Sequence, residues 1–538
     1  MKQFLKYIFF SASLIGVVTA CHQIEVPITS ELTPSVFPKD SIQFIQASGP
    51  AYAGLRGSFS VDYFFIQSQS TDEAIMPAYG GNWYDNQNYR MLHYHSWTKD
   101  HGFTNSCWGY LSTVIGTTNQ TLSILGMNEP EGQNKRTNLS ELKMVRAIAY
   151  FMMMDIYGNV PIDTLYGDFT PRANAPRAQV FSFIEREVKA AIPNLSAITG
   201  ITTYGRATKH TANALLAKLY LNAEYYTGTK RYDDCIAACD NVINSGLFAI
   251  EPMNTYLQMF YPNNGPQMKE FIFALPYDPA YVALPGTNGF NYHARYDVPR
   301  SEAAKFKLPF TPNGPEATLP EYYANFNDPN DIRNKQWLTG LQFMSDGVTP
   351  VMVTTTKLGY DQFYTGSDGG APYTFQVNIT PNVILRQNPA LFDVGNDEIA
   401  WNSGYRNIKF YPDNTSTNRN QNNDVPMFRY SDIILMKAEA ILRGGNATLG
   451  HTPVSLVNML RINRTTSPAL SSVALGDIYS ERCREFAWEC WHRNDMIRFG
   501  KFEGTWGFKT DTDPNHRILP IPTNAMALNP ALKQNPGY

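Results

Sequence analysis

This 538-residue chain has few long apolar runs, no excess of basic residues and none of the common catalytic signatures. The main apolar run, residues 7–18, is shorter than the roughly 20 residues that a transmembrane helix requires. Residues 1–20 hold two of the 44 basic side chains and no acid, so 42 basic and 47 acidic side chains follow them, a net charge of −5. This mild charge, without long runs of one sign, argues against a nucleic-acid partner.

Cysteine is also scarce, and its spacing excludes a regular disulfide framework. An odd number of cysteines follows Cys21, at irregular intervals, namely Cys107, Cys235, Cys239, Cys483 and Cys490. The paired CxxC motifs of a structural zinc site are absent. We therefore interpret these five cysteines as small buried hydrophobic residues.

Signatures of catalysis are missing as well. The chain has no GxSxG, HExxH, Walker or GxGxxG motif. A metal site could be drawn from His93 and His95 with Asp72 and Glu73, but we interpret the histidines as polar residues of a loop or strand edge. The Asp/Asn-rich segments 327–334 and 413–424 offer oxygen ligands for calcium, yet neither matches the EF-hand pattern. No catalytic residue, metal ligand or cofactor is predicted.

The first 21 residues carry the most informative pattern that is present. Lys2 and Lys6 precede the apolar run, and Val18-Thr19-Ala20 leads directly into Cys21. A short apolar run followed by small residues is a secretion signal, and a cysteine at this point is typical of a bacterial lipoprotein. We predict a signal peptide over residues 1–20 and lipid attachment at Cys21. The alternative is an ordinary secretory peptide with a chance cysteine.

Several segments show the three- and four-residue apolar spacing of amphipathic helices. The clearest are 141–157, which Asn138 or Ser140 could cap and Gly158 ends, then 208–226, and a helix opening near Tyr232. The helix–turn–helix over 208–246 is close to one tetratricopeptide unit. Similar patterns recur at 179–192, 430–443, 453–464 and 476–494.

The remaining sequence has a different character. Residues 250–425 are rich in Pro, Gly, Asn, Asp and Tyr, with short β-like runs at 271–275, 351–356 and 407–411, and residues 60–110 are similarly irregular. Loops of this kind usually carry binding groups. The predicted fold class is mainly α: a tetratricopeptide-like helical scaffold with a large irregular loop-rich half and a few short β-strands.

Four segments together resemble the SusD/RagB family of outer-membrane nutrient-binding lipoproteins of the Bacteroidetes. They are RAIAYF with DIYGNVP at 146–161, GRATK with ALLAKLYL at 205–221, RYSD with LMKAEA, ERCREF and WHRNDMIR between 429 and 498, and LPIP with QNPGY at 519–538. Cys483 and Cys490 depart from the family pattern and concern helix packing. The resemblance implies an N-terminal SusD-like region with tetratricopeptide-like helices over 21–248. It also implies a C-terminal RagB/SusD region over 249–538, loop-rich to about 425 and then helical.

The third segment also contains charges of both signs on consecutive helical turns. Glu481, Arg482, Arg484 and Glu485 could form ion pairs with neighbouring helices, and the alternative is an ordinary solvated helix face.

The resemblance also implies a function. The expected protein is a non-catalytic lipoprotein on the surface of the outer membrane that binds oligosaccharides, or alternatively peptides. It would deliver them to a SusC-like TonB-dependent β-barrel transporter and sit over its extracellular mouth. Two other classes stay open: a surface-anchored glycan hydrolase, whose carboxylate pair is defined by separation in space, and a helical-repeat scaffold without a small ligand.

An oligosaccharide site needs flat aromatic platforms beside polar side chains. Residues 70–97 supply this mixture, and the predicted ligand-binding residues there are Asp72, Trp83, Tyr84, Asp85, Asn86 and Arg90. The segment 288–296 is a second candidate wall, with Asn291, Tyr292 and Tyr296, and Trp337 is a third. Trp97 and Trp108 are predicted to be core, and buried packing is the alternative for Trp83.

Overall fold

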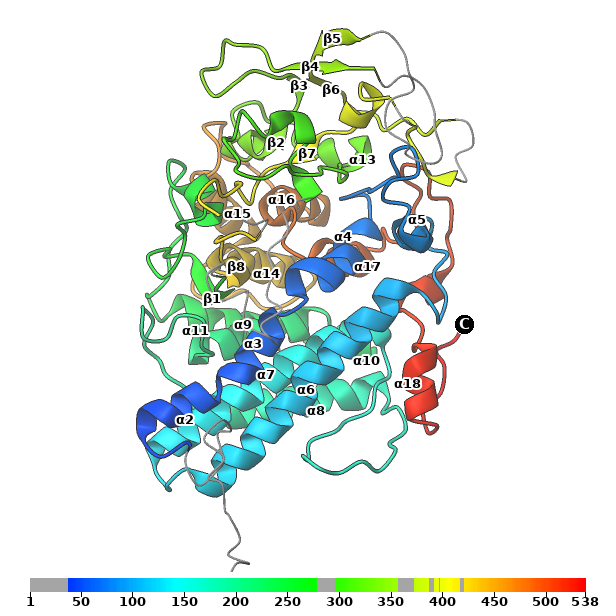
Figure 1. Ribbon diagram of the computed structural model, residues 1–538. Helices are drawn as coiled ribbons and strands as arrows, with labels where there is room; N and C mark the ends of the chain where they lie inside the picture. Colours follow the sequence, from blue (N-terminus) through cyan, green and yellow to red (C-terminus); the bar gives the residue numbers. More distant parts are fainter. Residues whose placement is uncertain (1–36, 278–295, 357–371, 387–390, 396, 417–419) are drawn as a thin grey trace, which may run out of the picture.

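A stack of helices extends from the bottom of the molecule to above its middle in Figure 1. The computed structural model describes residues 37–277, 296–356, 372–386, 391–395, 397–416 and 420–538. The stack contains α6 (Gly102–Asn128), α7 (Gln133–Tyr157), α8 (Arg177–Ala191), α9 (Lys209–Leu221), α11 (Tyr232–Ile243), α14 (Tyr430–Leu442), α15 (Pro453–Arg461) and α16 (Leu475–Phe486). Each helix from α6 to α15 packs against the next, and α14 also contacts α16. The prediction of a mainly helical fold is confirmed.

Capping residues set several of the predicted boundaries. Thr208 and Thr211 exchange hydrogen bonds between side chain and backbone, and this capping box starts α9. Gly158 ends α7 with a φ of 72°, which glycine adopts without strain. Tyr232 begins α11 as expected.

Other boundaries differ from the sequence prediction. Helix α7 begins at Gln133, so Asn138 and Ser140 lie inside the helix and do not cap it. The 208–226 segment divides at Asn222 into α9 and α10 (Ala223–Thr227). The 476–494 segment divides into α16 and α17 (His492–Arg498), because Trp488 and Cys490 adopt left-handed φ values of 63° and 64°.

The region 60–110 is more helical than predicted. The structure has α2 (Ser41–Ala47), α3 (Gly49–Arg56), the π-helix η1 (Phe59–Tyr63), α4 (Phe64–Gln69), the 3-10 turn η2 (Asp85–Gln87) and α5 (Asn88–Tyr94) before α6. His93 lies in the last turn of α5 and His95 is its C-cap, and both are buried, so their interpretation as polar residues of a loop or strand edge is wrong.

Short antiparallel strand pairs accompany the loops of the loop-rich half, and most of them lie in the upper half of Figure 1. The pairs are β1 (Phe271–Leu275) with β8 (Val425–Arg429), β2 (Trp337–Leu338) with β7 (Arg406–Asn407), β3 (Gly340–Leu341) with β6 (Asn378–Ile379), and β4 (Met352–Thr355) with β5 (Tyr373–Gln376). Of the predicted runs, 271–275 and most of 351–356 are strands, whereas only the first residue of 407–411 is. Short helices are η3 (Ile192–Asn194), η4 (Tyr256–Phe260), η6 (Arg300–Glu302), α13 (Pro320–Tyr323), η7 (Ile332–Gln336), η9 (Ala400–Asn402), η10 (Pro514–Arg517) and α18 (Thr523–Leu528).

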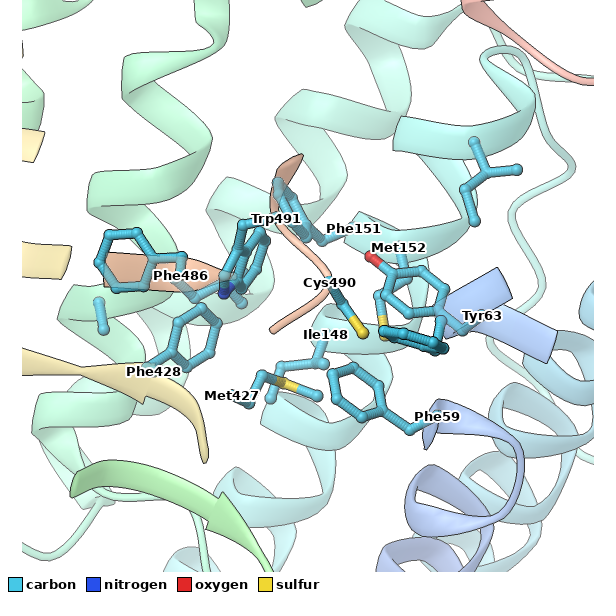
Figure 2. Close-up of a cluster of buried hydrophobic side chains, with 14 of the residues drawn as sticks. Phe59, Tyr63, Ile148, Phe151, Met152, Met427, Phe428, Phe486, Cys490 and Trp491 are labelled. Atoms are coloured by element: carbon cyan, nitrogen blue, oxygen red, sulfur yellow. The ribbon is translucent and has the colours of Figure 1, made fainter. Parts of the chain in front are cut away.

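One continuous hydrophobic core joins the N-terminal helices, the helical stack and the C-terminal segment. Figure 2 shows part of this core, where Phe59 and Tyr63 of η1 face Ile148 and Cys490. Trp97 and Trp108 are core residues, as predicted. The five cysteines of the described chain are all free and buried, which confirms their interpretation as small hydrophobic residues. Within the described residues, no helix combines the length and apolar character that crossing a bilayer demands.

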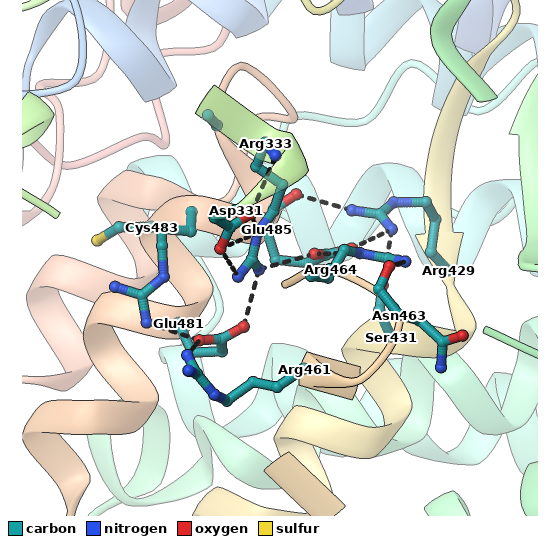
Figure 3. Close-up of polar contacts among 12 residues, drawn as sticks. Asp331, Arg333, Arg429, Ser431, Arg461, Asn463, Arg464, Glu481, Cys483 and Glu485 are labelled. Carbon is teal, nitrogen blue, oxygen red and sulfur yellow. Dashed lines mark hydrogen bonds and ion pairs between the residues drawn. The ribbon is translucent and has the colours of Figure 1, made fainter. Parts of the chain in front are cut away.

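A buried ion network connects the loop-rich half to the helices, so the predicted ion pairs are confirmed (Figure 3). At its centre, the Glu485 carboxylate meets Arg429 at 2.8 Å, Arg464 at 2.9 Å and Arg333 at 3.0 Å. The network continues to Glu270, Asp331, Lys409, Glu481 and Glu489. Burial alone would raise the pKa of Glu485, but the three guanidinium groups outweigh it and hold the pKa well below its ordinary value.

We expect Glu485→Gln to destabilise the protein by roughly 3–5 kcal/mol, because it leaves buried guanidinium groups without their shared counter-ion. Denaturant unfolding measures the change. Glu131→Gln is the control: Glu131 pairs with Lys135 and its own side chain is 83% exposed, so removing this charge should change the unfolding free energy far less. Equal losses for the two variants would contradict a special role for the network.

Candidate functional site

A cavity of about 390 Å³ lies between four segments of the upper half. They are the turn before α5, η6 with residues 313–314, strand β4, and η9. The lining residues are Tyr79, Asn82, Trp83, Pro299, Arg300, Ser301, Asn313, Gly314, Met352, Val353, Thr354, Glu398, Trp401 and Asn402. The volume falls within the roughly 300–1,000 Å³ typical of small-molecule sites.

Trp83 and Trp401 give the cavity its flat surfaces, and each packs against a tyrosine. Trp83 packs edge-on against Tyr296, with ring centroids 5.6 Å apart and an interplanar angle of 75°. Trp401 packs edge-on against Tyr79 at 5.9 Å, and its indole N–H donates to the Gly395 carbonyl at 2.7 Å. Both indole rings are half-buried, so each is held by the protein while part of its surface stays open.

The turn that carries Trp83 is fixed from the protein interior. The buried Asp393 carboxylate accepts hydrogen bonds from the backbone N–H groups of Gly80 at 2.9 Å, Gly81 at 2.7 Å and Gly395 at 2.7 Å. Gly80 and Gly81 have left-handed φ values of 59° and 83°, which glycine tolerates best. Asp393 is therefore a positioning residue for Trp83.

Backbone strain is concentrated in the same turn. Trp83, Asp85, Asn86 and Gln87 have φ values of 68°, 38°, 54° and 65°. A non-glycine residue in this region costs on the order of 1–3 kcal/mol, and such positions cluster at functional sites. The Arg90 side chain supports the turn by donating to Gln87 Oε1 at 2.8 Å.

Polar groups of both charge signs surround the aromatic surfaces. Asn82 and Arg300 are exposed, whereas Asn313 and Glu398 are half-buried. Among the described residues that line the cavity, Glu398 is the only carboxylate. Amide, guanidinium and carboxylate groups beside aromatic faces can hydrogen-bond a ligand rich in hydroxyl groups.

The predicted ligand residues divide between the cavity and other places. Trp83 lines the cavity and Tyr296 supports it, while Tyr84, Asp85 and Asn86 are exposed on the following turn, outside the lining. Trp337 is a core residue that packs edge-on against Trp488 at 5.4 Å. Asp72 lies next to His492. Asn291, Tyr292 and Cys21 lie outside the described residues.

The sequence did not point to Trp401, Asp393, Arg300 or Asn313. These residues lie more than 200 positions from Trp83 in the chain. Each belongs to a segment without helical or strand periodicity, so only the tertiary structure brings them to one cavity.

Two buried carboxyl groups lie just behind the wall formed by Pro299 and Gly314. Asp297 and Glu316 are hydrogen-bonded to each other, and Trp488 Nε1 donates to Asp297 at 3.3 Å. Burial raises the pKa of Asp297 to about 8. Burial and the nearby Asp297 charge raise the pKa of Glu316 well above its ordinary value.

A cysteine, a histidine and an aspartate also form a row in the interior. Cys483 Sγ lies 3.8 Å from His492 Nδ1, and His492 Nε2 lies 2.6 Å from Asp72 Oδ1. Burial raises the pKa of the Cys483 thiol, and the side chain is only 3% exposed. A buried thiol of this kind is inert, and we assign the row a structural role.

The molecule is thus a mainly helical protein whose cavity is built by loops beside the helical stack. Two family models match the sequence: one described as the SusD family over residues 213–538, and one described as starch-binding associating with outer membrane over residues 60–221. The first covers more than half of the chain. The chain belongs to the SusD family.

Known proteins of similar sequence and structure carry related descriptions. The chain is 24% identical to the starch-binding protein SusD of Bacteroides thetaiotaomicron, over 99% of each chain. A solved laminarin-binding SusD-like protein matches with a TM-score of 0.72 and 20% identity, covering 93% of this chain and all of that one. Surface glycan-binding protein A of B. thetaiotaomicron, solved with laminarihexaose, matches with a TM-score of 0.66 and 17% identity, covering 91% and 98%.

We expect the Asp297–Glu316 pair to make stability fall as pH rises from about 4 to about 8. In this window the unfolded Asp297 has lost its proton and the folded one retains it, so unfolding releases a proton. Each such proton changes the unfolding free energy by about 1.4 kcal/mol per pH unit. Asp297→Asn removes this titration and should flatten the pH dependence of the melting temperature. An Asp100→Asn control, at an exposed site, should keep the parent's slope, and a parent slope retained by Asp297→Asn would contradict the assignment.

Proposed function

We propose that the protein binds neutral oligosaccharides in the cavity walled by Trp83 and Trp401. The observation that carries this proposal is the pairing of two held indole rings with amide groups in one cavity. Sugars present apolar C–H faces to aromatic rings and hydroxyl groups to amides. Arg300 and Glu398 balance in charge, which favours a neutral ligand. The described starch and laminarin binding of related proteins supports the same ligand class.

Binding without catalysis is part of the proposal. Glycoside hydrolysis uses two carboxyl groups on either side of the scissile bond, about 5–5.5 Å apart for retention and about 6.5–9.5 Å for inversion. Glu398 is the one carboxylate among the described residues that line the cavity. Asp297 and Glu316 are hydrogen-bonded to each other and at most 2% exposed, so neither can flank a substrate.

The location of the cavity fits a role at the cell surface. Helix α2, the first described element, lies at the bottom of Figure 1, and strand β4 of the cavity wall lies at the top. A lipid on Cys21 would hold the first end near the membrane and leave the cavity facing outward. We further propose delivery of the bound oligosaccharide to a SusC-like TonB-dependent transporter, a partner implied by membership of the family.

We expect Trp83→Ala to lower affinity for a bound oligosaccharide at least tenfold, about 1.4 kcal/mol, because exposed aromatic surfaces supply a large share of such binding. Calorimetric titration of glycans selected from an array measures the effect, and reducing-end assays on the same mixtures should detect no cleavage.

Tyr84→Ala is the matched control for this variant. It removes the exposed aromatic residue next in sequence, which lies outside the cavity lining, and should bind within about twofold of the parent. Parent-like affinity of a folded Trp83→Ala would place the site elsewhere. Cleavage abolished by Glu398→Gln would support a hydrolase, and binding of peptides alone would support the peptide alternative.

Membrane attachment is tested at Cys21. Two or three acyl chains, each methylene contributing about 0.8 kcal/mol, anchor a protein stably. Cys21→Ala should therefore appear in the soluble fraction, whereas the parent remains with the outer membrane. A large β-barrel should co-purify with the parent from detergent-solubilised membranes. Unchanged fractionation of the variant would contradict lipid anchoring, and repeated recovery without a barrel would contradict the partner.

A further inference from the structure

A second polar cluster lies where the end of α5 meets residues 511–516, and none of its members lines the cavity. One nitrogen or oxygen atom from each of His95, Asp511 and His516 lies within 4.8 Å of the other two. His95 Nδ1 is 3.8 Å from Asp511 Oδ1, and His516 Nδ1 is 2.8 Å from the same oxygen. His95 is buried, whereas Asp511 and His516 are half-buried, so the cluster has an open side.

The hydrogen bonding of His95 leaves its second nitrogen aimed at the carboxylate. His95 Nε2 lies 2.8 Å from the Ser70 carbonyl oxygen, which can only accept, so Nε2 carries the proton. In the neutral ring, Nδ1 then presents a lone pair toward the Asp511 carboxylate, which is also an acceptor. A distance of 3.8 Å is too long for a direct hydrogen bond. A cation between the two atoms would satisfy both.

We propose that His95, Asp511 and His516 form a binding site for a divalent transition-metal ion, with Zn²⁺ as the best match. Zn²⁺ binds imidazole nitrogen and carboxylate oxygen at about 2.0–2.2 Å, which in tetrahedral geometry separates ligand atoms by about 3.3 Å. The two distances to Asp511 lie on either side of that value. Two imidazoles disfavour calcium, which takes oxygen ligands. Three protein ligands leave a fourth position for water.

The surroundings support the site. A metal-binding histidine usually donates its other N–H to a carbonyl or carboxylate, which fixes the ring, and the Ser70 carbonyl does this for His95. Phe502 stacks on the His95 ring with centroids 4.6 Å apart, and Trp97 packs at 4.8 Å. This aromatic shell limits access of water to the buried ligand.

Two neighbouring cations are engaged with backbone oxygens. Lys509 Nζ donates to the carbonyls of Phe502 at 3.0 Å and Gly504 at 2.6 Å. Arg493 Nη2 donates to the Arg517 carbonyl at 2.7 Å. Their positive charges oppose a metal ion, but these hydrogen bonds direct both cations to backbone carbonyls, whereas the Asp511 carboxylate faces the two histidines.

The proposed metal ligands differ from the set close together in sequence, in which Asp72 and Glu73 would join His93 and His95. Asp72 is paired with His492, and Glu73 accepts hydrogen bonds from Trp488 and Tyr322. His95 instead meets residues more than 400 positions later in the chain. A bound ion would therefore join the end of α5 to the C-terminal segment.

The test uses the full-length protein in detergent, without a polyhistidine tag, after removal of metal with a chelator. Calorimetric titration with ZnCl₂ should give one site per chain, and Co²⁺ should produce the visible absorption of a tetrahedral complex. Saturating Zn²⁺ should raise the melting temperature. Asp511→Asn and His516→Ala should each weaken Zn²⁺ binding at least about tenfold.

His451→Ala is the control, because it removes a half-buried histidine outside the cluster and should leave Zn²⁺ affinity unchanged. Circular dichroism establishes that each variant is folded. The proposal is overturned if the metal-free parent binds no Zn²⁺, or if folded Asp511→Asn and His516→Ala both bind like the parent. It is also overturned if Zn²⁺ leaves the melting temperature unchanged while acidification raises it, since a proton then fills the gap.

Discussion

The shared carboxylate of Glu485 is the interaction on which the arrangement of the two halves depends. Its three arginine partners come from η7, from the end of β8 and from the segment after α15. Burying so many charges is favourable only when every partner is present, so the network specifies one arrangement more than it adds net stability. Trp488 follows Glu485 by three residues and donates hydrogen bonds to Glu73 and Asp297. Asp297 in turn precedes the cavity wall at Pro299. Trp488 and Asp297 therefore connect the ion network to the cavity wall.

Apolar spacing at three- and four-residue steps was sufficient to predict most of the helical stack, although α9 and α14 are buried on nearly every side. The boundary signals were Gly158 at the end of α7 and the capping threonines Thr208 and Thr452 at the starts of α9 and α15. Helix α6 was missed although it is 27 residues long. It is rich in Thr, Ser, Gly and Asn, which favour helix weakly, and packing against α7 and α3 overrides that preference. The division of 476–494 could not be predicted either. It depends on left-handed Trp488 and Cys490, held by partners distant in sequence.

The candidate site was predictable only where its residues are close in sequence. Trp83 stood out because aromatic and polar residues lie close together around it, and Tyr296 is the last residue of a second such segment. Trp401 and Asp393 gave no comparable signal, because an isolated tryptophan or aspartate in a loop is more often structural. Trp337 illustrates the converse: its composition suits a sugar platform, but the fold places it in the core. Composition identifies suitable side chains, and tertiary contacts decide which of them meet.

The left-handed turn from Trp83 to Gln87 has a thermodynamic consequence for recognition. Contacts with Asp393, Arg90 and Tyr296 hold this turn in its strained conformation in the folded protein, so the cost of the strain is met before any ligand binds. The indole ring therefore loses little additional freedom when a ligand binds, and association avoids the roughly 0.5–1.5 kcal/mol of ordering entropy that a mobile side chain would contribute. A flexible oligosaccharide loses considerable entropy of its own on binding. Because the protein surface is already ordered, almost all of the entropy lost on binding is the ligand's. Stiff or helically preordered glycans should therefore bind more tightly than flexible ones of equal length.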